Sequence, residues 1–185
     1  QCSRIGGSNG VKHLKNLDSL NVNGLPYLSP DAYNVISNTN PTLKSLDISA
    51  TSIDDMSFTT ICTTIGGHLK SLSVEWCTNL SPNGLSALGH CVNITDVDMD
   101  GTLYLNQDVV LALSNCVNLS RLSATCAPNL MPSHCNIFTE KCQKLRIVKI
   151  NELVPAPLTA GCHSMVLALR KIPIETLRGC NSYSI

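Results

Sequence analysis

The sequence predicts an α/β leucine-rich-repeat solenoid, with a curved parallel sheet inside and helices outside. A leucine-rich pattern recurs about every 26 residues, and one copy is too small to bury its own apolar face, so neighbouring copies must stack. The spacing is also regular, because only the step to the last copy is clearly longer than the others. The first leucine-like positions of successive copies predict about seven repeats and are Leu17, Leu43, Leu69, Ile94, Leu119, Leu145 and Ile174.

The third copy shows most clearly what one repeat contains. Leu72 and Val74 alternate with polar residues, as expected for a strand with one buried face. Ser81 and Pro82 then supply a helix N-cap and a proline at the first helical position, and apolar residues from Leu85 onward recur at helical spacing. One repeat is therefore a strand followed by a helix.

The same interpretation gives the order of elements along the chain. Strands joined by a helical return must lie parallel, so the strands form one sheet and the helices lie outside it. The predicted strands are 19–23, 45–49, 71–75, 96–100, 121–125, 146–151 and 175–179, and the predicted helices are 30–38, 54–65, 82–91, 107–115, 132–142 and 160–170.

Length and composition agree with a single leucine-rich-repeat domain over residues 1–185. The chain is 43% hydrophobic, and residues 1–12 are expected to form a loop or the tail of a preceding repeat. Neither end shows a polar cap, so we expect further chain or neighbouring proteins to cover the ends, which favours a subunit of a larger assembly. No apolar run approaches the roughly 18 residues of a membrane span, so no membrane insertion is expected.

Charge and motifs exclude several classes of function. Lysine plus arginine and aspartate plus glutamate both number 13, so there is no overall positive charge to hold nucleic acid. The sequence contains no phosphate-binding glycine loop and no recognisable set of catalytic groups. We therefore expect a protein that is not an enzyme and uses no cofactor or small-molecule substrate.

The chain has ten cysteines, and several of them fall at equivalent positions of the repeat. Cys91, Cys116 and Cys142 each lie shortly before the first leucine-like position of the next repeat, where a small apolar thiol packs well. We expect buried, reduced thiols and an intracellular, reducing compartment: cytoplasm, cilium or nucleus, with the mitochondrial matrix as a further option. Neighbouring pairs such as His90-Cys91 diverge on a helix and do not share one ion, so no metal site is expected.

Three aspartates in the fourth repeat resemble the start of a calcium-binding loop. Asp96, Asp98 and Asp100 alternate with the core positions Val97 and Met99, however, so they point outward along a strand and do not wrap around one ion. The strand register instead predicts an acidic stripe on the concave face of the sheet.

The concave face is the predicted partner-binding surface. Its outward residues change from neutral to acidic to basic along the chain, a pattern that orients a partner of complementary charge. The alternative is that these polar residues only keep an exposed sheet soluble, and that Trp76 covers the core instead of contacting a partner. The predicted site residues are Asp47, Glu75, Trp76, Asp96, Asp98, Asp100, Arg121, Lys149 and Arg178, and Tyr27 and Tyr104 are candidates to extend the rim.

The motif of the third repeat and two joints between repeats resemble the cysteine-containing class of leucine-rich repeat, as found in F-box proteins, here without a visible F-box. The resemblance implies a horseshoe-like scaffold that binds other protein subunits through its concave face. It also implies an alternative, the substrate-recognition portion of an F-box-type ubiquitin ligase, which requires an F-box segment ahead of Gln1. The residues that carry it are Leu69, Leu72, Val74 and Cys77, with Cys91-Val92-Asn93-Ile94 and Cys116-Val117-Asn118-Leu119.

Overall fold

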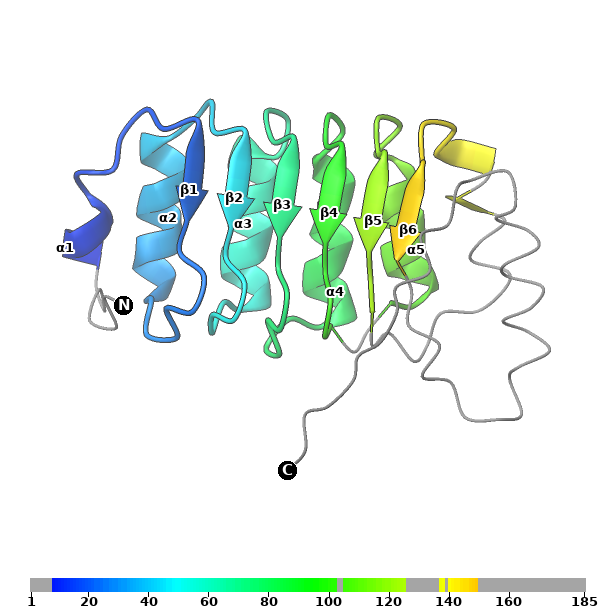
Figure 1. The fold of residues 1–185 in the computed structure, drawn as a ribbon. Coiled ribbons are helices and arrows are strands. Elements are labelled where there is room, and N and C mark those ends of the chain that lie inside the picture. The colour runs from blue at the N-terminus through cyan, green and yellow to red at the C-terminus, as the bar shows by residue number, and fades with distance from the viewer. Residues whose placement is uncertain (1–7, 103–104, 126–136, 139, 150–185) are drawn as a thin grey trace.

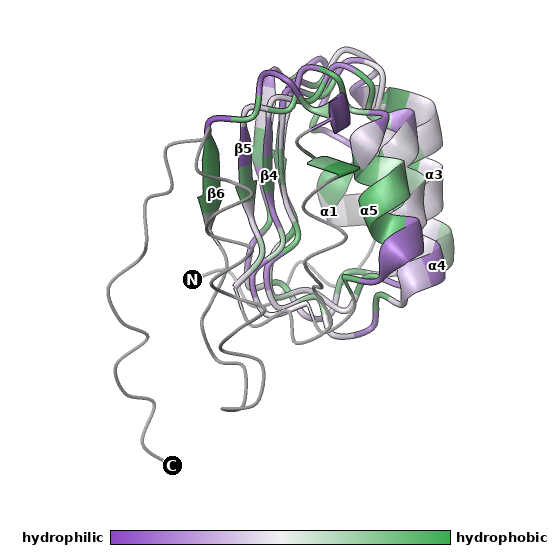
Figure 2. Ribbon diagram, turned by 90° about the vertical axis from the view of Figure 1, so that its right-hand side faces the viewer, coloured by the Kyte–Doolittle hydropathy of each residue, from purple (hydrophilic) through white to green (hydrophobic). Residues whose placement is uncertain are grey.

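The computed structural model describes residues 8–102, 105–125, 137–138 and 140–149. Over these residues, short strands alternate with helices along the chain (Figure 1). The strands lie side by side in one layer, and the helices form a second layer that covers one face of the sheet (Figure 2). The predicted α/β class with a parallel sheet is confirmed.

Over the described residues, the sheet has six strands in the order of the sequence, and each neighbouring pair is parallel. The strands are β1 (Ser19–Asn21), β2 (Ser45–Asp47), β3 (Ser71–Ser73), β4 (Asp96–Asp98), β5 (Arg121–Ser123) and β6 (Ile147–Lys149). The helices are α1 (Ser8–Val11), α2 (Pro30–Thr39), α3 (Asp55–Ile65), α4 (Pro82–Leu85), the 3-10 helix η1 (Ser86–His90) and α5 (Gln107–Ser114). None of the described helices is both long enough and apolar enough to cross a bilayer.

The sheet register places each residue opposite its equivalent in the next repeat. Leu20 pairs with Leu46, and Leu46 pairs with Leu72. Val97 and Leu122 continue the same row in β4 and β5. Paired residues in neighbouring strands are therefore one repeat apart in the sequence, as the leucine spacing predicts.

The described strands are shorter than the strands predicted from the sequence. A left-handed turn ends each of the first four: Gly24, Ala50, Trp76 and Gly101 have φ of 72, 52, 55 and 72°. Hydrogen bonds between repeats nevertheless continue up to these turns, since the amide of Gly24 donates to the carbonyl of Ser49 at 2.9 Å. The stacking of repeats therefore extends beyond the regular strands.

The segment predicted as one helix over 82–91 is instead the short helix α4 followed by η1. Gly84 and Gly89 lower the helix propensity of this segment. The amide of Cys91 accordingly makes a 3-10-type bond to the carbonyl of Leu88 at 2.9 Å. The predicted helix 132–142 is only partly described, and the helix 160–170, the strand 175–179 and the seventh repeat from Ile174 lie outside the described residues.

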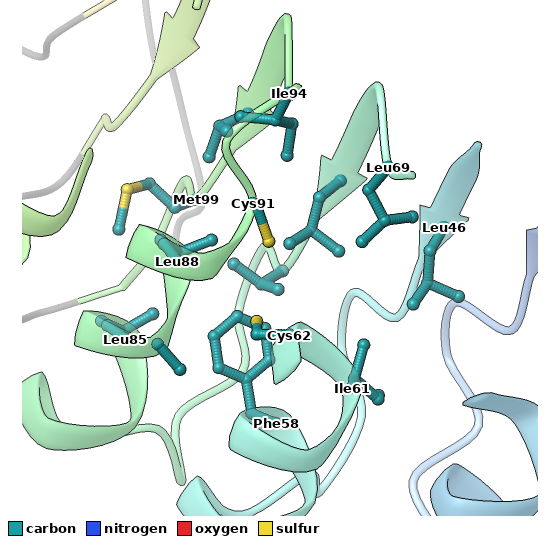
Figure 3. Packing of buried hydrophobic residues seen from close by; sticks show 14 of the residues in the cluster. Leu46, Phe58, Ile61, Cys62, Leu69, Leu85, Leu88, Cys91, Ile94 and Met99 are labelled. Carbon is teal, nitrogen blue, oxygen red and sulfur yellow. The ribbon is translucent and has the colours of Figure 1, made fainter. Parts of the chain in front are cut away.

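The core lies between the sheet and the helices (Figure 3). Leucine-like side chains such as Leu46, Leu69 and Ile94 extend from the sheet layer toward α3, where Phe58 and Ile61 are also buried. Each of these five side chains is at most 1% exposed. The predicted ladder of core positions is thus present in the described repeats.

The five described cysteines are free, and all are buried. Burial raises the pKa of Cys116 to about 12 and that of Cys142 to about 11, so both thiols stay protonated at neutral pH. Cys77 Sγ donates to the carbonyl of Ile48, in the preceding repeat, at 3.1 Å. The thiols of Cys77, Cys116 and Cys142, whose pKa values burial raises, act as small core groups and are unsuited to nucleophilic attack, which requires the thiolate. The five are Cys62, Cys77, Cys91, Cys116 and Cys142.

A carboxylate of one repeat holds the start of the helix in the next. Asp55, in the first turn of α3, accepts hydrogen bonds from the backbone amide of Ser81 at 2.8 Å and from the Ser81 hydroxyl. Ser81 is the N-cap of α4, as predicted, and its Oγ accepts from the amide of Asn83 at 3.2 Å. Gly84 leaves the space that the Asp55 carboxylate occupies, because a Cβ there would lie 2.1 Å from Oδ1.

We predict that Gly84→Ala destabilises the protein by about 1–3 kcal/mol, although alanine is the better helix former by about 1 kcal/mol. The added methyl displaces Asp55 and breaks its two bonds to Ser81. Urea unfolding measures the change. Gly67→Ala is the matched control, because a Cβ at Gly67 meets nothing within 4 Å. Equal stability of the two variants would contradict this account.

Candidate functional site

The face of the sheet that points away from the helices carries a hollow of about 270 Å³. It extends from β2 to β5 across the middle of the sheet. Carboxylates and serines dominate its lining, together with one arginine. The lining residues are Asp47, Ser71, Leu72, Ser73, Glu75, Asp96, Val97, Asp98, Arg121 and Ser123.

Strand alternation and register assemble this hollow. In β2, β3 and β4 the central residue is buried and the two flanking residues are partly exposed on the sheet face. The register then aligns Ser71, Asp96 and Arg121 in one row across three strands. A second row, further along each strand on the same face, contains Ser73, Asp98 and Ser123.

Glu75 follows β3, and this arrangement perturbs its carboxyl group. Its burial, together with the charge of Asp98 and a hydrogen bond with that residue, raises the pKa of Glu75 to about 7. The charges of Asp100 and Asp47 act in the same direction. A cationic group placed in the hollow would favour the ionised form of Glu75 and offset this repulsion.

Asp96 and Arg121 form an ion pair across β4 and β5. Arg121 Nε donates to Asp96 Oδ1 at 2.8 Å, while Thr95 Oγ1 donates to Asp96 Oδ2 at 2.7 Å. The Arg121 side chain is 53% exposed, so the pair adds little stability and stays open to a partner.

Asp47 and Asp98 serve both the hollow and the backbone. Asp47 Oδ1 accepts from the amide of Ser49 at 3.0 Å, and Asp98 Oδ1 accepts from the amide of Asp100 at 3.2 Å. In each case the carboxylate bonds to an amide just beyond the end of its own strand. This bond orients the side chain before any partner arrives.

Asp100 differs from the other predicted acidic residues. Its Oδ1 accepts from the Ser123 hydroxyl and from the amide of Thr125, both at 2.7 Å. Asp100 is not among the residues that line the hollow. It therefore joins the ends of β4 and β5, although its charge still contributes to the acidic surface.

Trp76 lies at the left-handed turn after β3, with φ of 55° and 56% of the residue exposed. A Cβ added to Gly101 would come within 2.5 Å of the indole ring, so the ring lies against the backbone of the equivalent turn in the next repeat. Trp76 thus packs on one side and presents its other side at the rim, immediately after Glu75. The contact of Trp76 with a partner remains a prediction.

The positions of the other predicted rim and site residues are as follows. Lys149 ends β6, and Tyr27 is 72% exposed in the turn that leads to α2. Tyr104 and Arg178 lie outside the described residues.

Sequence reasoning did not single out Gly101 or the serines of the hollow as site residues. Gly101 occupies the position in the fourth repeat that Trp76 occupies in the third, and a glycine there is the signal that a bulky neighbour fills the space. Ser71, Ser73 and Ser123 leave room for the hollow because they are small. Within the described ranges, no group of three or more histidine, cysteine or acidic residues is arranged to hold a metal ion.

No protein-family model matches the sequence, and no curated protein sequence matches it. Solved structures match it in fold. The chain is similar to the C-terminal domain of tropomodulin from Caenorhabditis elegans, with a TM-score of 0.56 and 16% identity, over 74% of this chain and 90% of that chain. It is also similar to actin-binding site 2 of leiomodin-1, with a TM-score of 0.59 and 14% identity, over 74% of this chain and 86% of that chain. At these identities the likeness shows the fold alone, which is of the leucine-rich-repeat type.

We predict that Glu75→Gln stabilises the protein more at pH 8 than at pH 5. Since the folded-state pKa of Glu75 is raised to about 7 from 4.5, ionisation of Glu75 destabilises the fold. Its contribution to stability is complete below about pH 4.5 and is lost as the pH rises through 7. Thermal unfolding at both values measures the effect. Asp108→Asn, which removes an exposed carboxylate from α5, is the control. If Glu75→Gln changed the melting temperature by the same amount at pH 5 and pH 8, the prediction would be contradicted.

We also predict that Gly101→Ala lowers the melting temperature more than Gly24→Ala. Both glycines have φ of 72°, so both variants place alanine in the left-handed region. Only at Gly101 does the new methyl meet the indole, whereas a Cβ at Gly24 meets nothing within 4 Å. Because Trp76 is the chain's one tryptophan, its fluorescence should shift to longer wavelength in Gly101→Ala alone. The same spectrum in both variants would argue against packing of Trp76 on Gly101.

Proposed function

We propose that this protein is a non-enzymatic protein-interaction module that binds its partner through the concave face of the sheet. The hollow of about 270 Å³ carries the proposal, because it combines recessed shape with four carboxylates and one arginine on adjacent strands. The backbone hydrogen bonds that hold Asp47 and Asp98 pre-orient this surface. A preorganised polar surface binds with less loss of side-chain entropy than a flexible one.

The charge pattern defines the partner that fits. Asp47, Glu75 and Asp98 gather at one side of the hollow, and Arg121 lies at the other side with Asp96. A partner with a basic side chain beside an acidic one complements both parts. Trp76, exposed at the rim, adds apolar contact area next to the charged surface.

The fold supports a role of this class. One domain with the same fold is described as an actin-binding site of leiomodin-1, so the fold is used there to bind a protein. For the present chain we propose a scaffold subunit of a larger intracellular complex, built as a solenoid of about seven repeats of the cysteine-containing class. The buried, free thiols of the described repeats support a reducing compartment. The alternative role in an F-box-type ubiquitin ligase is a hypothesis that the sequence ahead of Gln1 tests.

We predict that Ser71→Arg abolishes partner recovery. Ser71 lines the hollow, and an arginine there fills the space and neutralises neighbouring carboxylates. Native co-purification of the full chain with quantitative mass spectrometry measures recovery, and crosslinks locate the contacts. We expect at least a tenfold loss, since hot-spot contacts are worth about 2 kcal/mol or more.

Asn38→Arg is the matched control, because it adds the same charge at an exposed position of α2, away from the sheet face. Circular dichroism establishes that both variants are folded. Equal recovery of stoichiometric partners by Ser71→Arg and Asn38→Arg would remove the hollow from the binding surface.

A further inference from the structure

The described lysines and arginines are concentrated on one edge of the molecule, where the chain passes from the end of a helix to the start of the next strand. Arg121 and Lys149 are the described exceptions. The acidic residues on this edge are Asp18 and Glu140, whereas the other described carboxylates lie on the sheet face or near the first turns of helices. Although the formal net charge of the chain is zero, most of the described positive charges therefore lie on this edge and most of the described negative charges lie elsewhere. The basic edge consists of Lys12, Lys15, Lys44, Lys70, Lys141, Lys144 and Arg146.

Backbone hydrogen bonds order the basic edge. The amide of Lys44 bonds to the carbonyl of Asp18 at 2.9 Å, and the amide of Lys70 bonds to that of Lys44 at 2.7 Å. In the following repeats the equivalent residues are Thr95, Ser120 and Arg146. The amide of each donates to the carbonyl of the equivalent residue in the preceding repeat at 2.8 Å. At a strand spacing of about 4.8 Å, Lys70 and Arg146 are about 14 Å apart along the edge.

From Lys44 onward, the basic edge divides into two clusters. One contains Lys44 and Lys70, and the other contains Lys141, Lys144 and Arg146. The turns of the two repeats between them carry no charge at this edge.

Neutral groups hold two of these lysines in place. Lys70 Nζ donates to the carbonyl of Asn93 at 3.3 Å, and Lys144 Nζ donates to Asn118 Oδ1 at 2.6 Å. Neither of these contacts neutralises the ammonium charge. Lys44 pairs with Asp18 at 2.8 Å, but their side chains are 61% and 77% exposed, so this ion pair is weak and exchanges readily.

We infer that the basic edge docks an extended acidic segment of a protein partner, with carboxylates contacting both clusters. An extended chain advances about 3.3 Å per residue, so clusters about 14 Å apart match acidic groups about four or five residues apart. The uncharged stretch between the clusters fits this spacing better than the uniform charge of a nucleic-acid backbone. This surface is separate from the hollow on the sheet face and goes beyond the proposed function.

Fluorescence anisotropy with two synthetic peptides tests the inference. The spaced peptide carries two Glu-Glu pairs separated by a Gly-Ser-Gly spacer, and the block peptide carries the same residues with all four glutamates consecutive. The edge variant combines Lys70→Gln, Lys144→Gln and Arg146→Gln. The control variant combines Thr59→Glu, Thr63→Glu and Gln107→Glu, which changes the net charge by the same amount at exposed positions of α3 and α5.

We expect the full chain to bind the spaced peptide more tightly than the block peptide, with an affinity that falls as salt is added. The edge variant should lose at least tenfold in affinity, and the control variant less than twofold. Equal losses in both variants would mean that only net charge matters, and would overturn the inference. Absence of peptide binding would also overturn it, and tighter binding of polyuridylate than of either peptide would assign the edge to nucleic acid.

Discussion

The one-repeat register of the parallel ladder is the constraint on which the rest of this structure depends. Each strand residue lies opposite its equivalent in the next repeat, so an apolar residue at a core position always meets another apolar residue. Contacts between repeats follow the same rule. Asp55 reaches Ser81 in the next repeat, and Cys77 donates to the carbonyl of Ile48 in the preceding one. Each repeat is therefore stabilised mainly by its neighbours.

The same register determines the chemistry of the surface. It places Glu75 near Asp98, although the two belong to successive repeats, and their proximity and burial raise the pKa of Glu75 to about 7. It also gathers lysines on the turns that precede the strands, far from most carboxylates. Like charges are tolerated because these side chains lie at the surface, where water reduces their repulsion.

Several polar groups of the described sheet face are held in place by hydrogen bonds. Asp47 and Asp98 are held by backbone amides, and Asp96 is paired with Arg121. Such groups contribute shape and fixed charge, which suit the binding of another macromolecule. The sheet face and the basic edge carry opposite charge, so the two binding surfaces proposed above call for partners of different charge.

The sequence by itself determined the fold class, the period, and the outward direction of Asp96 and Asp98. These follow from the spacing of apolar residues. When alternate residues of a strand are apolar and face the core, the residues between them must face the other side of the sheet. Only the tertiary structure decided that Asp100 joins β4 to β5 and that Trp76 rests on Gly101. Each of these depends on side-chain packing between residues about one repeat apart, and a one-dimensional pattern specifies which residues are neighbours without specifying which of their atoms meet.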